Sequence, residues 1–518
     1  MLLLSAPAAA APRIVLVGLD GASWSVIDPL VEAGRMPNLK AFLKRGVHAE
    51  LETVEPVISP VVWTSIATGQ PPEIHGIGDF FGDARAIRAP TIFERASVQG
   101  LRVGTFEWLV SWPAQELPGG FVAPAWLRQD HTTSPADLFV RAGIPRYAYS
   151  NQGLRSRSEF FGSSFEETRR KASAWNALTK TFDLDAGAIT FYALDALSHR
   201  FWADTFPEGF DADDLAGRGL EPAFRGAVEK GYEAIDDAIG ELVAALPNES
   251  VVLIASDHGF QAGDRFERRW SFGLEEELAR AGLVPGREAF RIEGQFGMAS
   301  LSVKPGLFEE REPLLKKLVA FFEAAHDNEG DALFNVVVFD QIDRPAGQER
   351  SWGERLRQWG YRLAARCLFS IEFDSPAHAI IVLIPENEAL EGAWPDGRVT
   401  LGGMEVPIRQ VVYGDGFTGT HHPTAVFLAA GGPIRALNER QQLSVLDIAP
   451  LFLHLAGVAV PDDLDGEFPA RFLTDDWLLA NPIRSVAASD LPRLPPPAGP
   501  EHEDALLIER LRAMGYVD

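Results

Sequence analysis

Cysteine is almost absent from this sequence. Of 518 residues, one is a cysteine, Cys367. No internal disulfide can therefore form, and no cluster of thiolates can hold a metal ion. A single cysteine fits a reducing compartment, so we expect a cytoplasmic protein. The alternative is an exported protein, because residues 1–12 are largely apolar and carry neither lysine nor arginine.

Long apolar runs and positive charge are also scarce. The sequence has no run of about 18 apolar residues, so we expect no integral membrane segment. Its 47 lysines and arginines are outnumbered by 73 aspartates and glutamates, which gives a formal net charge of −26. This charge repels nucleic acid, which we exclude as a partner. A site for a small anionic substrate would need local positive charge, which bound divalent cations supply. No pattern in the sequence fixes an oligomeric state.

Short apolar runs alternate with helical periodicity along much of the chain. Four runs are typical of buried strands, at residues 14–19, 188–194, 251–255 and 425–430. A helix is predicted over residues 164–180, with Ser164 and Glu167 as a capping box at its start. The alternation predicts an α/β fold, with a mostly parallel sheet that carries helices on both faces.

The order of these segments also suggests a domain organisation. We expect a discontinuous catalytic core at residues 14–264 and 401–480, because the strands with polar ends lie there. Residues 265–400 are interpreted as a cap or insertion, since none of its strand ends carries possible metal ligands. Residues 481–518 are predicted to form a proline-rich linker and a C-terminal helix.

Acidic and imidazole side chains follow the predicted strands. Asp20 follows the first strand, Asp195 follows the run at 188–194, and Asp257 and His258 follow the run at 251–255. Ligands in open α/β sheets bind beyond the carboxyl ends of the strands, so these side chains should converge. His199 comes four residues after Asp195 and can face the same ion. We expect Gly259 to give the backbone freedom that lets Asp257 and His258 reach one centre.

A last imidazole completes the set. His421 is preferred to His422, because His422 precedes Pro423 and is expected to face solvent. Three carboxylates and three imidazoles are enough ligands for two divalent metal ions. Oxygen and nitrogen ligands without sulfur favour Zn²⁺, with Mn²⁺ or Fe as alternatives.

Ser59 is the preferred nucleophile. It precedes Pro60 at the start of a predicted helix, where serine suits the N-cap position and proline the first helical position. The positive end of the helix dipole and nearby free N–H groups could hold a phosphate oxygen there. Thr64, one turn further along, is the competing nucleophile, and Ser59 could also be only a helix cap.

At this point the residues resemble a known family. Three segments are similar to the type I phosphodiesterase/nucleotide pyrophosphatase family of the alkaline phosphatase superfamily: SPVVWTSIATGQPPEIHGIGDFF, YALDALSHRFW and VVLIASDHGF. Similar residues cover roughly 14–112, 186–262 and 411–470. The resemblance implies an alkaline phosphatase-like core. It also implies a two-metal-dependent phosphoric ester hydrolase, either a phosphodiesterase or a phosphatase, that acts on a small phosphate ester.

The resemblance also implies a role for each residue. One ion would be held by Asp20, Asp257 and His258 together with the nucleophile, and the other by Asp195, His199 and His421. Counting back from Thr68 and Gly69 places the nucleophile of the family on Ser59. The same chemistry leaves two alternatives: a phosphotransferase or mutase of the superfamily, and a catalytically inactive metal-binding regulatory protein.

Two positions depart from related patterns. Relatives that cleave nucleotides have an asparagine three residues after the nucleophile, which holds a phosphate oxygen, whereas this chain has Val62. That difference puts nucleotide diesters in doubt. The sulfatase signature is missing as well, since Trp63 stands where that signature needs arginine.

Overall fold

The computed structural model describes residues 13–125, 132–146, 157–211, 220–272 and 412–498, and parts of 273–340 and 379–408. The chain separates into two compact units. The first falls within Met1–Ser150, Phe161–Asp264 and Thr418–His502, and the second includes Arg265–Phe417. The C-terminal helix predicted near residue 503 lies outside the described residues. Within those residues, no helix is long and apolar enough to cross a membrane.

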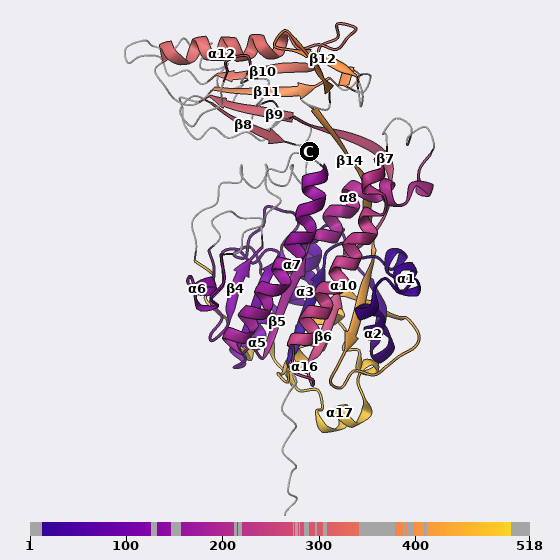
Figure 1. The fold of residues 1–518 in the computed structure, drawn as a ribbon. Helices are drawn as coiled ribbons and strands as arrows, with labels where there is room; N and C mark the ends of the chain where they lie inside the picture. Colours follow the sequence, from indigo (N-terminus) through magenta and orange to yellow (C-terminus); the bar gives the residue numbers. More distant parts are fainter. Residues whose placement is uncertain are drawn as a thin grey trace, which may run out of the picture. The chain divides into compact units, whose positions relative to one another are not determined.

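The first unit is built on an eight-stranded sheet of order β16-β2-β15-β6-β1-β5-β3-β4. The strands are β1 (Ile14–Leu19), β2 (Val47–Glu52), β3 (Val103–Trp108), β4 (Phe121–Pro124), β5 (Ala186–Phe191), β6 (Val251–Ala255), β15 (Thr424–Ala430) and β16 (Gln441–Ser444). The central strand β1 is fully buried and pairs in parallel with β5 and β6. This mostly parallel sheet with flanking helices confirms the predicted fold class (Figure 1).

Strand β15 alone runs against the others in this sheet, because it pairs antiparallel with both β2 and β6. Its apolar run was correctly predicted to be a buried strand, since residues 425–430 are all buried. A continuous apolar run reports burial on two faces but carries no information about strand direction.

Helices pack in two groups around this sheet (Figure 1). One group contains α1 (Trp24–Glu32), α2 (Pro37–Arg45), α8 (Ala193–Thr205) and α10 (Ala227–Ala245), in which α10 contacts the other three. The other contains α3 (Ser59–Thr68), α5 (Ile92–Val98) and α16 (Ile448–Leu455), in which α16 contacts the other two. The long helix α7 (Arg157–Phe182) also belongs largely to this unit.

One helix start and one strand end differ from the prediction. Helix α7 begins at Arg157, so Ser164 lies inside it and the predicted capping box is wrong. The Ser164 carbonyl instead accepts a hydrogen bond from Thr168 Oγ1, as is usual within a helix. Strand β5 ends at Phe191, and Leu194 already belongs to α8. Asp195 therefore lies in the first turn of a helix and not at a strand end.

A buried carboxylate caps helix α2. The side chain of Asp236, on α10, accepts hydrogen bonds from the backbone nitrogens of Asn38 (3.0 Å) and Leu39 (2.7 Å). Asp236 is fully buried, and the N-cap residue of α2, Met36, makes no side-chain cap of its own. The carboxylate therefore satisfies two N–H groups that the start of a helix leaves without partners.

We expect Asp236→Ala to lower the free energy of unfolding by about 2–4 kcal/mol, because one buried and one half-buried backbone donor lose a carboxylate acceptor. Urea denaturation measures this loss. The neighbouring Asp237 is exposed, so Asp237→Ala is the matched control and should leave stability nearly unchanged. Equal effects of the two substitutions would contradict the capping role.

The second unit has its own sheet and core. Its four strands are β8 (Phe290–Gln295), β9 (Met298–Val303), β10 (Phe334–Asp340) and β11 (Ala379–Pro385), in the order β10-β11-β9-β8 with antiparallel pairing. Helix α12 (Phe308–Glu323) contacts β10 and β11, and β12 (Arg398–Leu401) pairs with β13 (Met404–Pro407). Leu318, Phe322 and Ile381 lie in its buried apolar core.

Candidate metal centre

The predicted ligands come from separate elements of the first unit. Asp20 directly follows β1, and Asp257 and His258 come two and three residues after the last residue of β6. Asp195 and His199 lie one turn apart on α8. His421 lies on β14 (Val412–His422), a strand that pairs with β7 (Gly259–Phe272).

Asp20, Asp257 and His258 form the first group. One ligand atom from each lies within 4.8 Å of the others, and all three residues are buried. His258 Nε2 lies 3.3 Å from Asp257 Oδ2 and 3.7 Å from Asp20 Oδ1. Ser59 Oγ adjoins this group, at 3.4 Å from Asp20 Oδ1 and 3.3 Å from His258 Nε2. The hydroxyl thus lies among the atoms that would surround an ion.

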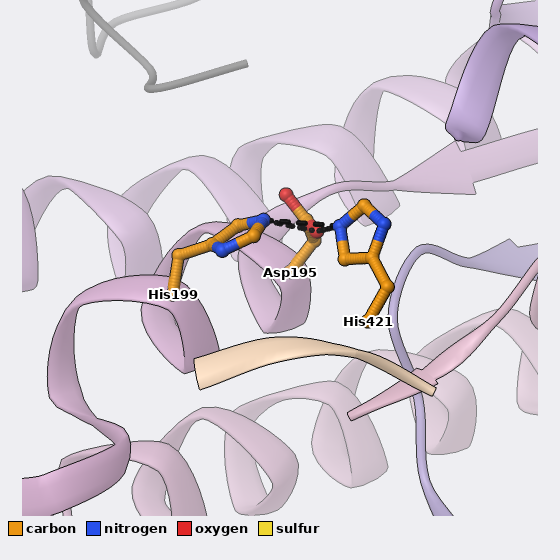
Figure 2. Close-up of side chains that lie close together, drawn as sticks. All are labelled: Asp195, His199 and His421. Carbon is orange, nitrogen blue, oxygen red and sulfur yellow. Dashed lines mark hydrogen bonds and ion pairs between the residues drawn. The ribbon is translucent and has the colours of Figure 1, made fainter. Parts of the chain in front are cut away.

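Asp195, His199 and His421 form the second group. Figure 2 shows the two imidazoles turned toward the carboxylate of Asp195. His199 Nε2 lies 3.3 Å from Asp195 Oδ1, and His421 Nε2 lies 3.4 Å from the same atom. The two Nε2 atoms are 3.1 Å apart. Three potential ligand atoms therefore converge on one point.

The two groups adjoin each other. The rings of His258, from the first group, and His421, from the second, are stacked with their centroids 3.6 Å apart. The charge of Asp195 also reaches the first group, where it helps to raise the pKa of Asp20 and of Asp257. All six predicted ligands thus lie in one cluster, as a two-ion centre requires.

All three imidazoles share one orientation. In each ring, Nδ1 lies near the oxygen of a backbone carbonyl group. The partners are Val57 O for His421 at 2.9 Å, Gly419 O for His199 at 3.1 Å, and Gly259 O for His258 at 3.2 Å. A carbonyl oxygen can only accept, so Nδ1 carries the hydrogen and Nε2 of the neutral ring presents a lone pair to its group. Histidines that ligate metals are oriented by such carbonyl contacts.

Burial makes this cluster costly without cations. Asp20, Asp195 and Asp257 are fully buried. Burial and the nearby carboxylates hold the pKa of Asp20 well above its ordinary value, and burial and Asp195 raise the pKa of Asp257 to about 7. Among the described residues, no group donates a hydrogen bond to Asp257 Oδ2, which is buried. Divalent cations would supply the missing positive charge and a partner for that oxygen, so these residues fit metal ions.

The position of Ser59 differs slightly from the prediction. It is the first residue of α3, and Ile58 occupies the N-cap position, so Ser59 does not cap the helix. Its hydroxyl points to Asp20 and His258 instead. The rival Thr64 is buried, and its hydroxyl donates to the Pro60 carbonyl at 2.6 Å within the helix. Ser59 is therefore the hydroxyl that adjoins the ligand cluster.

Two neighbouring details concern His422 and Gly259. His422 Nδ1 accepts a hydrogen bond from Thr424 N at 3.1 Å, whereas the ring of His421 reaches the second group.

Gly259 has no positive φ, so its expected role in backbone freedom is wrong. A β-carbon there would lie 2.3 Å from the Thr424 carbonyl oxygen, so glycine is needed for the close approach of two backbones.

Sequence reasoning missed the role of Trp63 in this cluster. Trp63 Nε1 donates a hydrogen bond of 2.9 Å to Asp20 Oδ2, and the indole is fully buried. It therefore fixes the carboxylate whose other oxygen adjoins Ser59. The spacing offered a signal, because residues 59 and 63 are one helical turn apart and share a face of α3.

Several solved structures are similar to this chain. Murine ectonucleotide pyrophosphatase/phosphodiesterase 5, an inactive variant in complex with AMP, is 16% identical with a TM-score of 0.42, and the match covers 89% of this chain and 100% of that one. The human form of that protein gives the same values. Phosphonoacetate hydrolase from Sinorhizobium meliloti 1021, in complex with phosphonoacetate, is 17% identical with a TM-score of 0.40, and the match covers 87% of this chain and 96% of that one.

A comparison with protein families is more specific. Residues 14–310 match the family described as type I phosphodiesterase/nucleotide pyrophosphatase. The matched range is more than half of the chain and contains Ser59 and five of the six clustered acids and imidazoles, all except His421. The chain therefore belongs to the type I phosphodiesterase/nucleotide pyrophosphatase family, whose members are metal-dependent hydrolytic enzymes.

Proposed function

We propose that this protein hydrolyses phosphoric esters with two divalent ions, Zn²⁺ in preference to Mn²⁺ or Fe, and with Ser59 as the nucleophile. The observation that carries this proposal is the position of Ser59 Oγ, 3.4 Å from Asp20 and 3.3 Å from His258, in a cluster of two adjoining ligand groups. Asp20, Asp257 and His258 would hold one ion. Asp195, His199 and His421 would hold the other.

The chemistry of the proposed reaction follows from these positions. Bound divalent cations would lower the pKa of the serine hydroxyl and stabilise charge on the attacking and leaving oxygens. Ser59 Oγ forms a bond to phosphorus while the bond from phosphorus to the leaving oxygen breaks. The serine proton passes to solvent, and the leaving oxygen takes up a proton from solvent. Water then attacks the phosphoserine ester and restores the Ser59 hydroxyl. Before the attack, Asp20, fixed by Trp63, keeps the Ser59 hydroxyl aligned.

The natural substrate is proposed to be a small phosphate ester other than a nucleotide diester. Val62 takes the position at which nucleotide-cleaving relatives carry an asparagine, and it is fully buried. A valine offers no hydrogen bond to a phosphate oxygen. We propose further that residues 265–400 act as the insertion that selects among such esters.

A metal-reconstitution assay tests the proposal. The protein is stripped of metal with a chelator, and Zn²⁺ or Mn²⁺ is then added in the presence of bis(4-nitrophenyl) phosphate or 4-nitrophenyl phosphate. We expect hydrolysis of at least one ester to return with Zn²⁺ as the ion content rises to two per chain. If two ions are bound and neither ester is hydrolysed, the protein is a metal-binding protein of another kind.

The contact from Trp63 to Asp20 gives a separate prediction. Trp63→Phe keeps an aromatic ring but removes the donor to Asp20, so we expect ester turnover or metal affinity to fall by about 10–100-fold. The matched control is Trp24→Phe, which removes the hydrogen bond of 3.0 Å from another buried indole to the Ala49 carbonyl. A similar loss in both variants would show a structural effect and not the positioning of Asp20.

A further inference from the structure

A cavity lies within the first unit, apart from the ligand cluster. Its volume is about 370 Å³, and it opens between α3, α5 and β3 on one side and residues 488–497 on the other. None of the six clustered acids and imidazoles lines it, and neither does Ser59. Its walls include Phe93, Leu109, Val110 and Leu491, so most of its lining is apolar. The metal chemistry proposed above makes no use of this space.

A buried tryptophan lines the cavity. Trp108 is 3% exposed, and its Nε1 has no hydrogen-bond partner among the described residues. The indole ring is fixed by edge-to-face contacts with Trp63 and Phe93, at centroid distances of 5.0 Å and 5.1 Å. The indole therefore forms a fixed part of the apolar wall.

The charges around the cavity favour an anion. Four arginines and two carboxylates line it. Each carboxylate has one partner: Asp463 Oδ2 accepts from Arg95 at 2.8 Å and Glu94 accepts from the backbone of Thr91 at 2.7 Å, while Asp463 Oδ1 has no partner among the described residues. Among the described residues, neither Arg88 nor Arg493 has an acidic partner, whereas Arg85 pairs with Asp83. In a chain with a net charge of −26, this local excess of arginine is unusual.

Arg88 is also held in place by the backbone beside it. Gly76 has a φ of +82°, and a β-carbon there would lie 2.7 Å from Arg88 Nε. The side chain of Arg88 therefore packs against a backbone that only glycine can provide. The backbone nitrogen of Arg88 donates to the His75 carbonyl at 2.9 Å, which fixes the start of this side chain as well.

We propose that this cavity binds a small amphiphilic anion, in which an apolar body lies against Phe93 and Leu491 and an acidic group meets Arg88. Apolar walls with a few polar groups are typical of small-molecule sites. Arginine supplies the charge and the hydrogen bonds that carboxylate, sulfonate and phosphate groups accept. The proposal is independent of the reaction at Ser59.

Calorimetric titration of the full-length, zinc-loaded protein with decanoate tests this proposal. We expect saturable binding of one decanoate per chain. Arg88→Gln should weaken binding about tenfold or more, because a charged hydrogen bond is lost. Neutral 1-decanol should bind at least about tenfold more weakly than decanoate.

Two further variants locate the site. Ala89 lines the cavity, so Ala89→Phe should fill it and abolish decanoate binding. Arg45 is an exposed arginine that packs over Phe42 and does not line the cavity, so Arg45→Gln should bind as the original protein does. Absence of saturable binding would overturn the proposal. Arg88 is exposed, so Arg88→Gln should not unfold the protein. Unchanged decanoate affinity in that variant would also overturn the proposal. Equal affinity for decanoate and 1-decanol would overturn it as well.

Discussion

Ser59→Ala is expected to lower the turnover of phosphate esters by at least about 10³-fold, because removal of a nucleophile leaves only binding and charge stabilisation to act on the substrate. The variant should still bind two ions, since all six acids and imidazoles remain. Ser59 is buried at 1% exposure and adjoins only the first group of ligands. Steady-state kinetics and elemental analysis of the same preparation measure both quantities.

Thr64→Ala is the matched control for this experiment. Thr64 lies on the same helix and also loses a buried hydroxyl, but that hydroxyl donates to the Pro60 carbonyl and not to a ligand of the cluster. Turnover should therefore stay within a few-fold of the original value. Loss of activity in Thr64→Ala together with full activity in Ser59→Ala would transfer the nucleophile to Thr64.

His421→Ala is expected to have the next largest effect. The substitution removes one of the three ligand atoms that converge in the second group, with its Nε2 at 3.4 Å from Asp195 and 3.1 Å from His199. We expect the ion content to fall from two per chain toward one. Turnover should fall by more than the roughly 100-fold that loss of a supporting contact to a ligand costs.

His422→Ala is the natural comparison for that variant. The two histidines are adjacent, but His422 accepts a hydrogen bond from Thr424 N and does not belong to either ligand group. Its replacement should leave both ion content and turnover close to the original values. If His422→Ala loses an ion while His421→Ala keeps both, the second group has been assigned to the wrong histidine.

Several parts of the fold were predictable because the local pattern allows one interpretation. The strand Ile14–Leu19 has the predicted bounds, and so does the strand Val251–Ala255. Each is a short run of apolar residues that is buried on both faces, followed by polar residues. The family resemblance was confirmed by the match over residues 14–310.

Other parts were not predictable from local pattern. The segment Tyr192–Leu194 continues the apolar run of β5 but belongs partly to helix α8, because buried strands and buried helices are equally apolar. Gly259 shows the same limit. Glycine is required at position 259 because the Thr424 carbonyl, which is distant in sequence, approaches its backbone closely. Its own φ angle does not require glycine.

The sequence alone determined which side chains could carry chemistry: three acids, three imidazoles and a serine beside apolar segments, in a chain whose single cysteine cannot form a thiolate cluster. The tertiary structure decided how they are arranged. It divides the ligands into two groups, stacks His258 on His421, orients each imidazole by a backbone carbonyl and fixes Asp20 by Trp63. These contacts join residues far apart in the chain. Their geometry depends on the packing of whole elements, which no local pattern of residues encodes.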